Sequence, residues 1–392
     1  MTTGDTSATS GSAEIEEPMR GVPVAQPVLS AAATGRSRAL LLTAVALLVA
    51  AVGLTWAKWL PYTDRVFGIA GSREYPGTSM LTAGSGLGPV ERAWTFTLAY
   101  SGAVWKALLV ALVISACVDV LVPRQWLVRV LGRRTPLGGS VAGGLASLPG
   151  MMCTCCTAPL TVTMRRAGVP TSAALAFWLG NPVLNPAVIV FIALLAPWPW
   201  VAVRVALGLL LVVGVSALLG HLATRRSGAR DVGVNPTGLG VSPAAVRLEQ
   251  AVTAPQVPVP TGQIPARLLR SFARLAVVLV PEYLLVVFAV GLVGEPLGRV
   301  LGEGGALAVL VAAAAGALLV LPTGGEVPIL LGLAAAGASA GVLGALLLTL
   351  PALSLPSAVM VGRALGWRVT AAAAAATVAV GVLAGGLLGV LG

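Results

Sequence analysis

The chain has 392 residues, of which 57% are hydrophobic and only 10% charged, and its mean hydropathy is +0.93. Soluble globular proteins carry about 25% charged residues. The composition therefore excludes an ordinary soluble domain and predicts an all-α polytopic membrane protein. The net charge of +11 comes mainly from arginines in short segments between apolar runs. We interpret it as an orientation signal rather than as a nucleic-acid-binding surface.

Residues 1–37 are rich in Thr, Ser, Ala, Gly and Pro, which predicts a disordered N-terminal tail. The first apolar run begins only at residue 38 and is long enough to span, which argues against a signal peptide. A transmembrane helix needs about 20 apolar residues. The segments that meet this requirement, within a few residues, are 38–60, 97–122, 170–196, 203–223, 270–293, 338–361 and 369–391.

These spans divide the chain into two membrane halves, residues 38–224 and 267–392, with the first repeat beginning at about residue 97. Residues 225–266 form a polar linker rich in Pro, Gly and Thr. The arginine-rich segments 123–136, 165–166 and 225–274 should be cytoplasmic. This places the N-terminus in the cytoplasm and the chain in the inner (plasma) membrane.

Two apolar stretches are too short to cross. Residues 137–152 reach only about 24 Å at 1.5 Å per residue, against a hydrocarbon core of about 30 Å. Residues 155–164 are shorter and end at a pair of arginines. They predict a re-entrant helical hairpin with its tip near the cysteines, and residues 304–336 predict a second hairpin.

Glycine and proline positions in the two halves match at a common offset of 169 residues. Three expected crossings lie between the hairpins, and an odd number inverts the second copy. Two inverted repeats with broken transmembrane helices are typical of secondary transporters. The alternative is a set of ordinary kinked helices without a shared site. The matched pairs are Pro159 with Pro328, Gly168 with Gly337, and Pro182 with Pro351.

Three of the four cysteines, Cys153, Cys155 and Cys156, lie within four consecutive residues. Thiolates are soft ligands for soft metals and metalloids, so the cluster predicts capture of a trivalent metalloid. Buried cysteines can also serve simply as small hydrophobic residues. A third reading is dithiol redox chemistry at the C-x-x-C pair Cys153 and Cys156. Redox carriers usually have a second cysteine pair, and here only Cys117 remains.

Asn181 and Asn185 each precede a proline inside an expected span. A buried asparagine is costly unless it forms hydrogen bonds, and each proline frees a backbone carbonyl. We expect both to line a polar cavity together with Ser354, which falls opposite Asn185 in the second repeat. The alternative is a helix kink in which asparagines join neighbouring helices.

Glu326 lies at the expected tip of the second hairpin, and Glu282 lies inside the span at 270–293. A carboxylate at the bilayer centre costs about 2.5–3.5 kcal/mol, so its presence needs a reason. Glu326 is the first candidate for a group that couples transport to protons or charge, and Glu282 is a candidate relay. A water-exposed loop position is the alternative for Glu326.

Other chemistry finds little support in the sequence. The single histidine, His221, lies at a span end, which excludes a histidine-based zinc or copper site. No phosphate-binding loop is present, so ATP-driven pumping by this chain alone is not expected. We expect no enzymatic activity, catalytic residue, resident metal or cofactor.

Several motifs resemble the ArsP-type permease family, which includes organoarsenical efflux permeases. The resemblance covers about residues 98–368 in consistent order. At the first tip the family pattern is Cys-Ser-Cys-Gly, and here Cys156 replaces the glycine. The resemblance implies a permease for which trivalent organoarsenicals are one substrate class. The matching segments are residues 153–160, 165–170, 173–177, 181–186, 327–329, 350–356 and 363–366.

The sequence therefore predicts a secondary permease that exports a soft small substrate such as a trivalent organoarsenical or metalloid. Its expected partners are the lipid bilayer and that substrate, and a homo-oligomer is left open. Two alternatives remain. One is a membrane thiol-disulfide carrier, and the other is a non-transporting assembly factor for a membrane enzyme.

Overall fold

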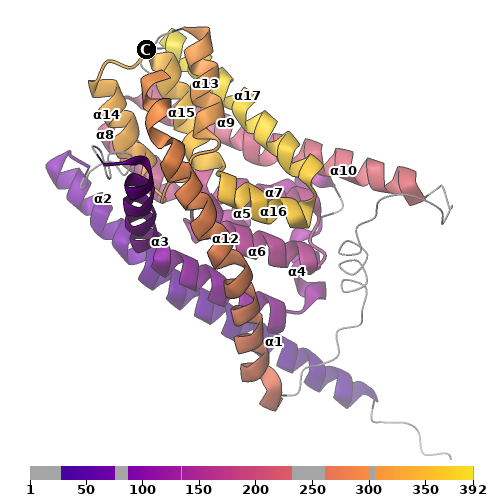
Figure 1. The fold of residues 1–392 in the computed structure, drawn as a ribbon. Coiled ribbons are helices and arrows are strands. Elements are labelled where there is room, and N and C mark those ends of the chain that lie inside the picture. The colour runs from indigo at the N-terminus through magenta and orange to yellow at the C-terminus, as the bar shows by residue number, and fades with distance from the viewer. Residues whose placement is uncertain (1–27, 76–86, 134, 232–260, 301–304, 392) are drawn as a thin grey trace, which may run out of the picture.

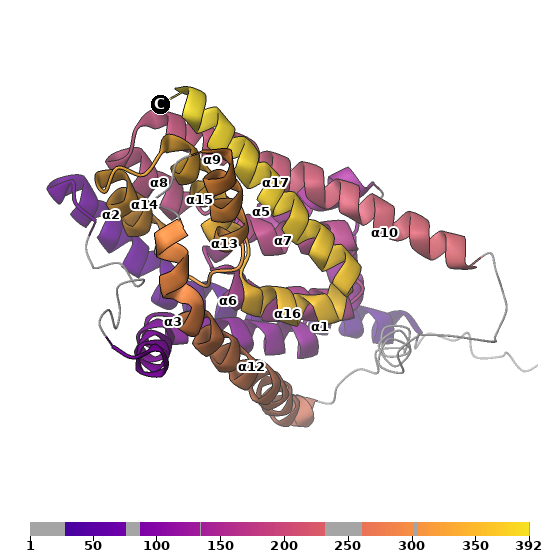
Figure 2. The ribbon, with the colours of Figure 1, turned by 45° about the horizontal axis from the view of Figure 1, so that its top comes forward.

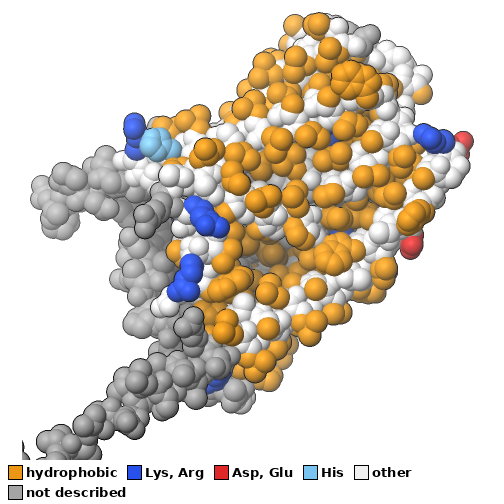
Figure 3. Space-filling model, turned by 180° about the vertical axis from the view of Figure 1, so that it is seen from behind, with side chains coloured by type: hydrophobic (Ala, Val, Ile, Leu, Met, Phe, Trp, Pro, Cys, Tyr) orange, Lys and Arg blue, Asp and Glu red, His pale blue; other side chains and the backbone are white. Residues whose placement is uncertain are grey.

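The computed structural model describes residues 28–75, 87–133, 135–231, 261–300 and 305–391 (Figure 1). Within these ranges every regular element is helical. The prediction of an all-α polytopic fold is confirmed. Apolar side chains cover most of the face shown in Figure 3, and the exposed charged side chains gather toward two of its ends, as expected for a bilayer-embedded surface.

Among the described residues, six helices are long and apolar enough to cross a membrane, and a pair bent by 52° makes a seventh candidate. They overlap all of the spans expected from hydropathy. The candidates are Arg38–Ser72, Pro89–Val120, Thr171–Leu195, Trp198–Arg225, Ile264–Ala289, Trp367–Leu391 and the bent pair Ala340–Ala352 with Leu355–Leu365.

The N-terminal helix is longer than the sequence predicts. It runs through α1 (Val28–Leu54), a π-helical turn η1 (Thr55–Trp59) and α2 (Leu60–Ser72) without interruption. Of the expected tail, residues 1–27 lie outside the described residues, and α1 already begins at Val28. The helix ends at Arg73, whose φ of 57° is left-handed.

The first half continues with two short helices at the position of the predicted hairpin, α5 and α6, which both pack on the following α7, the first part of a broken helix. A 3₁₀ turn at Leu148–Gly150 forms part of the hairpin tip. The elements are α3 (Pro89–Val120), α4 (Arg124–Leu131), α5 (Pro136–Ser147), α6 (Thr154–Arg166), α7 (Thr171–Val183), α8 (Pro186–Leu195), α9 (Trp198–Leu209), the π-helical η4 (Leu210–Val215) and α10 (Ser216–Asp231).

The second half has a similar order of helices, without a counterpart of α4 among the described residues. Residues 232–260 of the predicted linker lie outside the described residues, and the chain resumes with a 3₁₀ turn, η5 (Thr261–Gln263). The helices are α12 (Ile264–Val300), α13 (Ala306–Gly316), α14 (Glu326–Ala335), α15 (Ala340–Ala352), α16 (Leu355–Leu365) and α17 (Trp367–Leu391).

The helix boundaries recur at the offset found in the sequence. Helix α15 begins and ends 169 residues after α7, and α17 begins 169 residues after α9. The turns recur too, because Gly168 (φ 93°) and Gly337 (φ 84°) end α6 and α14 in the left-handed conformation that glycine tolerates. The duplicated helix order supports the predicted repeat. The inversion of its second copy stays a prediction.

The two halves pack on each other closely. Figure 1 shows α12 lying across α3, and Figure 2 shows α16 against α6 and α17 beside α15. Within each half, glycines allow the helix backbones to approach: a Cβ at Gly143 of α5 would collide with Ala173 of α7, and one at Gly344 of α15 would collide with Ala384 of α17. Small residues at helix contacts are the usual device in membranes, where no hydrophobic effect drives helices together.

Candidate functional site

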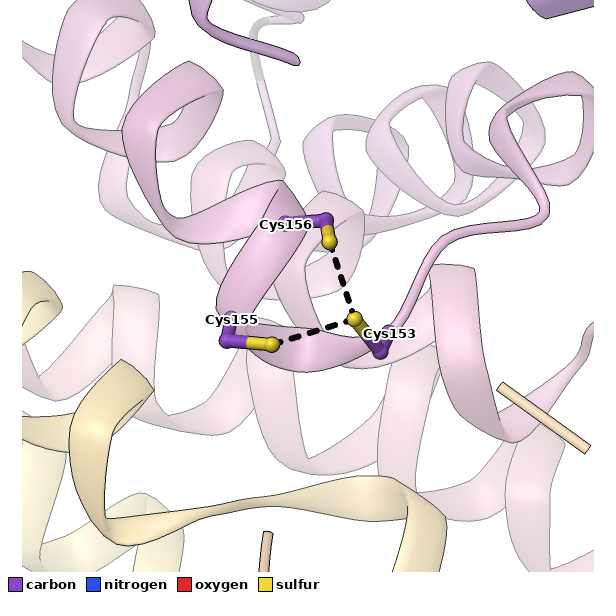
Figure 4. A group of neighbouring side chains, drawn as sticks. All are labelled: Cys153, Cys155 and Cys156. Carbon is purple, nitrogen blue, oxygen red and sulfur yellow. Dashed lines mark hydrogen bonds between the residues drawn. The ribbon is translucent and has the colours of Figure 1, made fainter. Parts of the chain in front are cut away.

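The three clustered cysteines converge at the start of α6 (Figure 4). Cys153 is the N-cap residue in an extended conformation, and Cys155 and Cys156 lie in the first turn. The Sγ atom of Cys153 is 3.1 Å from that of Cys155 and 3.0 Å from that of Cys156. All three sulfur atoms lie within 4.8 Å of one another and are buried as free thiols. The first turn of α6 also directs the positive end of its helix dipole toward them.

Two tyrosines from different halves face this thiol cluster. The hydroxyl of Tyr100, on α3, is 3.4 Å from Sγ of Cys155. The ring of Tyr283, on α12, is tilted against that of Tyr100 with 5.8 Å between centroids. Both side chains are buried. The thiols therefore lie where the contact between α3 and α12 meets the first hairpin.

The two hairpin tips are held by the same N-terminal helix. We define the first tip as residues 148–153 and the second tip as residues 317–325. Trp59 Nε1 donates to the carbonyl of Pro149 in the first tip at 2.8 Å. The hydroxyl of Tyr75, just past α2, donates to the carbonyl of Gly324 in the second tip at 2.8 Å. Both tips therefore lie beside the segment 59–75.

The two asparagines are fully buried where α7 gives way to α8. Asn181 Nδ2 donates to the carbonyl of Phe177 at 3.0 Å, and Asn181 Oδ1 has no partner among the described residues. A Cβ at Gly150 of the first tip would collide with that oxygen. Asn185 Oδ1 caps α8 by accepting from two backbone N–H groups, and its Nδ2 has no partner among the described residues. Each asparagine thus has one buried polar atom without a partner among the described residues.

Ser354 lies at the corresponding break between α15 and α16. Its hydroxyl is 2.9 Å from Thr154 Oγ1, in the first turn of α6, and donates to Ser357 Oγ at 3.0 Å. Thr154 lies between Cys153 and Cys155 in sequence. The structure thereby joins the break of the second half to the thiol-bearing helix of the first half.

Glu326 is the first residue of α14 and is 2% exposed, so it is not on a water-exposed loop. Its Oε1 accepts from Arg204 Nη2 of α9 at 3.0 Å. Arg204 is fully buried and also donates to three backbone carbonyls, two at the end of α7 and one in α15. Its guanidinium therefore binds both halves at their broken helices. The three carbonyls belong to Pro182, Val183 and Leu347.

The structure does not bring every expected residue to this region. Glu282 falls in α12, but its side chain lies outside the described residues. Conversely, sequence reasoning missed Arg204, Lys58 and the tyrosine pair. A signal was present for the first two, because a charged residue inside an apolar span is itself a sign of function. The tyrosines carry no such signal, since aromatic residues are common in membrane helices.

Comparisons with known proteins identify the family of the chain. A family model described as a predicted permease matches residues 90–390. The chain is 35% identical over 345 residues to the UPF0718 protein YraQ of Escherichia coli (strain K12), which covers 87% of this chain and 92% of the relative. No solved structure matches. The chain belongs to the ArsP_1 family of predicted permeases.

Proposed function

We propose that this permease is a secondary transporter that binds a trivalent organoarsenical or a similar soft metalloid at Cys153, Cys155 and Cys156 and exports it. The observation that carries the proposal is the convergence of three buried thiols within 4.8 Å. Trivalent arsenic is soft, takes up to three sulfur ligands and needs them close together, which this arrangement supplies. The family assignment supports transport rather than catalysis.

The binding chemistry needs no oxidant or reductant. A trivalent arsenical carries hydroxyl groups on arsenic. Each arsenic–sulfur bond forms as one arsenic–oxygen bond breaks, and the thiol proton leaves with the hydroxyl group as water. An arsenical with one organic substituent can therefore bind two of the thiols, and release is the reverse reaction with water.

The contacts between the halves suggest how transport proceeds. Thr154 meets Ser354, and Arg204 joins the break of α7 to Glu326. In an inverted-repeat transporter one repeat rocks against the other around the site. Such a movement would break the contact of Thr154 with Ser354 and the bonds of Arg204, and would form others. Glu326 is the group we assign to coupling, because a change in its charge would weaken its hold on Arg204. The N-terminus and the arginine-rich segments lie in the cytoplasm in this scheme.

The decisive experiment replaces Cys153, Cys155 and Cys156 with serine. Purified protein is titrated with phenylarsenous acid, and uptake of the same compound is measured in everted membrane vesicles. The triple variant should lose both binding and uptake, whereas Cys117→Ser, which removes the thiol outside the cluster, should keep them. Unchanged uptake in the triple variant would refute thiol capture.

A thiol-disulfide carrier is the second candidate, favoured by the 3.0 Å between the Sγ atoms of Cys153 and Cys156. Rapid alkylation, which traps the thiols of intact cells in their redox state, distinguishes a thiol-disulfide carrier from an arsenical transporter. A Cys153–Cys156 disulfide that accumulates when the cellular thioredoxin system is removed would support the carrier. Fully reduced cysteines under that condition, together with arsenical uptake, would support the transporter.

A further inference from the structure

Lys58 is a buried cation that the proposed function does not yet use. It lies in the π-helical turn η1, and its side chain is 8% exposed. Short π-helical turns inside α-helices are frequently found at functional sites, because the extra residue redirects side chains. The turn belongs to the N-terminal helix, which precedes the residues 90–390 matched by the family model.

The described residues give Lys58 only neutral hydrogen-bond partners. Its Nζ atom is 3.3 Å from the hydroxyl of Tyr62 and 3.3 Å from Oγ1 of Thr323 in the second tip. No carboxylate of the described residues lies within salt-bridge distance of it. Arg204, the other buried cation between the halves, has Glu326. A buried ammonium group without a counter-charge is strongly disfavoured, so this site is suited to an anion supplied from outside the chain.

Lys58 also lies close to the thiol cluster. Its ammonium group lies within electrostatic range of Cys153 and Cys156. The next residue, Trp59, is hydrogen-bonded to Pro149 in the first tip. The cation is therefore fixed between the thiol-bearing tip and Thr323 of the second tip, on the side of the thiols that the N-terminal helix covers.

We propose that Lys58, Tyr62 and Thr323 form an anion-binding subsite beside the thiol cluster, which selects substrates that carry a negatively charged group next to the thiophilic atom. The inference rests on the proposed function, because it assigns the second half of the same substrate. The ammonium group and the two hydroxyls would bind a carboxylate or similar oxyanion, while the cysteines bind the soft atom. The alternative counter-charge for the Lys58 ammonium group is a thiolate of the cluster itself.

A pair of ligands with the same arsenic group tests the subsite. Phenylarsenous acid is neutral, and its para-carboxylate derivative carries one negative charge. The wild-type protein should bind the carboxylate about tenfold more tightly or better, the effect of one charge-assisted hydrogen bond. Lys58→Gln should abolish this preference and leave the affinity for the neutral compound within about threefold, whereas Lys58→Arg should keep it.

The chain offers a matched control, because its other lysine, Lys106, is exposed and lies over the rings of Trp56 and Trp105. Lys106→Gln should keep the preference for the carboxylate. Thr323→Val, which keeps the side-chain shape, should reduce it in part. Affinity for the neutral compound in each sample reports that the variant is folded.

Each remaining outcome is decisive. If Lys58→Gln weakens both ligands equally, the lysine serves the thiols and the anion subsite is refuted. If the wild-type protein binds both ligands equally, the subsite is likewise refuted while the proposed function stands. If the wild-type protein binds neither, the proposed function fails and the subsite fails with it.

Discussion

The two hairpin tips lead into helices that end alike, but the tips themselves differ in backbone and in chemistry: the left-handed residue is Met151 in the first tip and Gly324 in the second. Each is followed by a short helix, α6 or α14, that contains a proline and ends at a left-handed glycine. The first tip leads to three thiols, whereas the second leads to Glu326, which occupies the place of Thr157. The proline and the terminal glycine of the following helices recur, whereas the residues that could contact a substrate do not. The similar helix ends therefore carry different chemistry, with soft groups after the first tip and a charged group after the second.

A pair of equivalent threonines shows the same divergence at the level of single contacts. Thr154, at the thiol-bearing tip, is 2.9 Å from Ser354 of the opposite half. Thr323, its counterpart 169 residues later, accepts a hydrogen bond from Lys58 of the N-terminal helix. Both positions carry threonine, but their partners differ: Thr154 meets Ser354 of the second half, whereas Thr323 meets Lys58 of the N-terminal helix.

The largest effect should come from breaking the buried ion pair between Arg204 and Glu326, the residue that follows the second tip. Replacing Arg204 with methionine leaves Glu326 buried without a partner and removes donors from three carbonyls. We expect a loss of about 3–5 kcal/mol in the free energy of unfolding, measured by denaturant titration in detergent. The pair of Arg274 with Asp119, whose side chains are 62% and 31% exposed, is the control: Arg274→Met should cost about 1 kcal/mol or less.

A double variant shows whether the unpaired charge is the cause. Arg204→Met combined with Glu326→Gln should recover part of the lost stability, since no uncompensated carboxylate then remains. Equal instability of the single and double variants would show that Arg204 acts through the helix carbonyls alone and not through the second tip.

Replacing a cysteine of the thiol cluster should change the affinity for arsenicals rather than the stability of the protein. Cys153 has the central sulfur, in contact with both other sulfurs. Its replacement by serine should weaken binding of phenylarsenous acid most among the single variants, by about tenfold or more, which is about 1.4 kcal/mol. Isothermal titration of the three single variants checks the order. Losses of equal size at all three positions would contradict a central role for Cys153.

The matched glycine turns after α6 and α14 predict equal losses of stability in the two halves. Gly168→Ala and Gly337→Ala each force alanine into a left-handed conformation and should each cost about 1–2 kcal/mol of stability. Gly102→Ala is a suitable control, because it lies within α3, where a Cβ meets nothing within 4 Å, and should not destabilise. Costs that differ by more than about twofold between Gly168 and Gly337 would argue against equivalent turns.

The smallest expected effect separates the two threonines. A double-mutant cycle of Thr154→Val with Ser354→Ala should give a coupling of about 0.6 kcal/mol, the average for hydrogen bonds between membrane helices. Thr323→Val with Ser354→Ala should give none, because these residues share no hydrogen bond in the described structure. Coupling between Thr323 and Ser354 would show that Ser354 also interacts with the second tip.

Much of the fold could be predicted from the sequence because its signals are local. Hydropathy located the spans, since each must bury its own backbone in lipid. The lengths of residues 137–152 and 155–164 indicated two short helices joined by a turn, and α5 and α6 occupy these positions. Proximity of the cysteines also followed from the sequence, because residues within one helical turn cannot lie far apart. The early start of α1 was missed, since Thr, Ser and Gly at residues 34–37 weaken the helical signal.

The sequence by itself determined the membrane class, the spans, the duplicated order of helices and the grouping of three thiols. Only the tertiary structure decided which charges meet. Glu326 lies 122 residues from Arg204, and Thr323 lies 265 residues from Lys58. Such pairs depend on the docking of one half and the N-terminal helix against the other, and docking is determined by shape summed over many small contacts rather than by any local pattern.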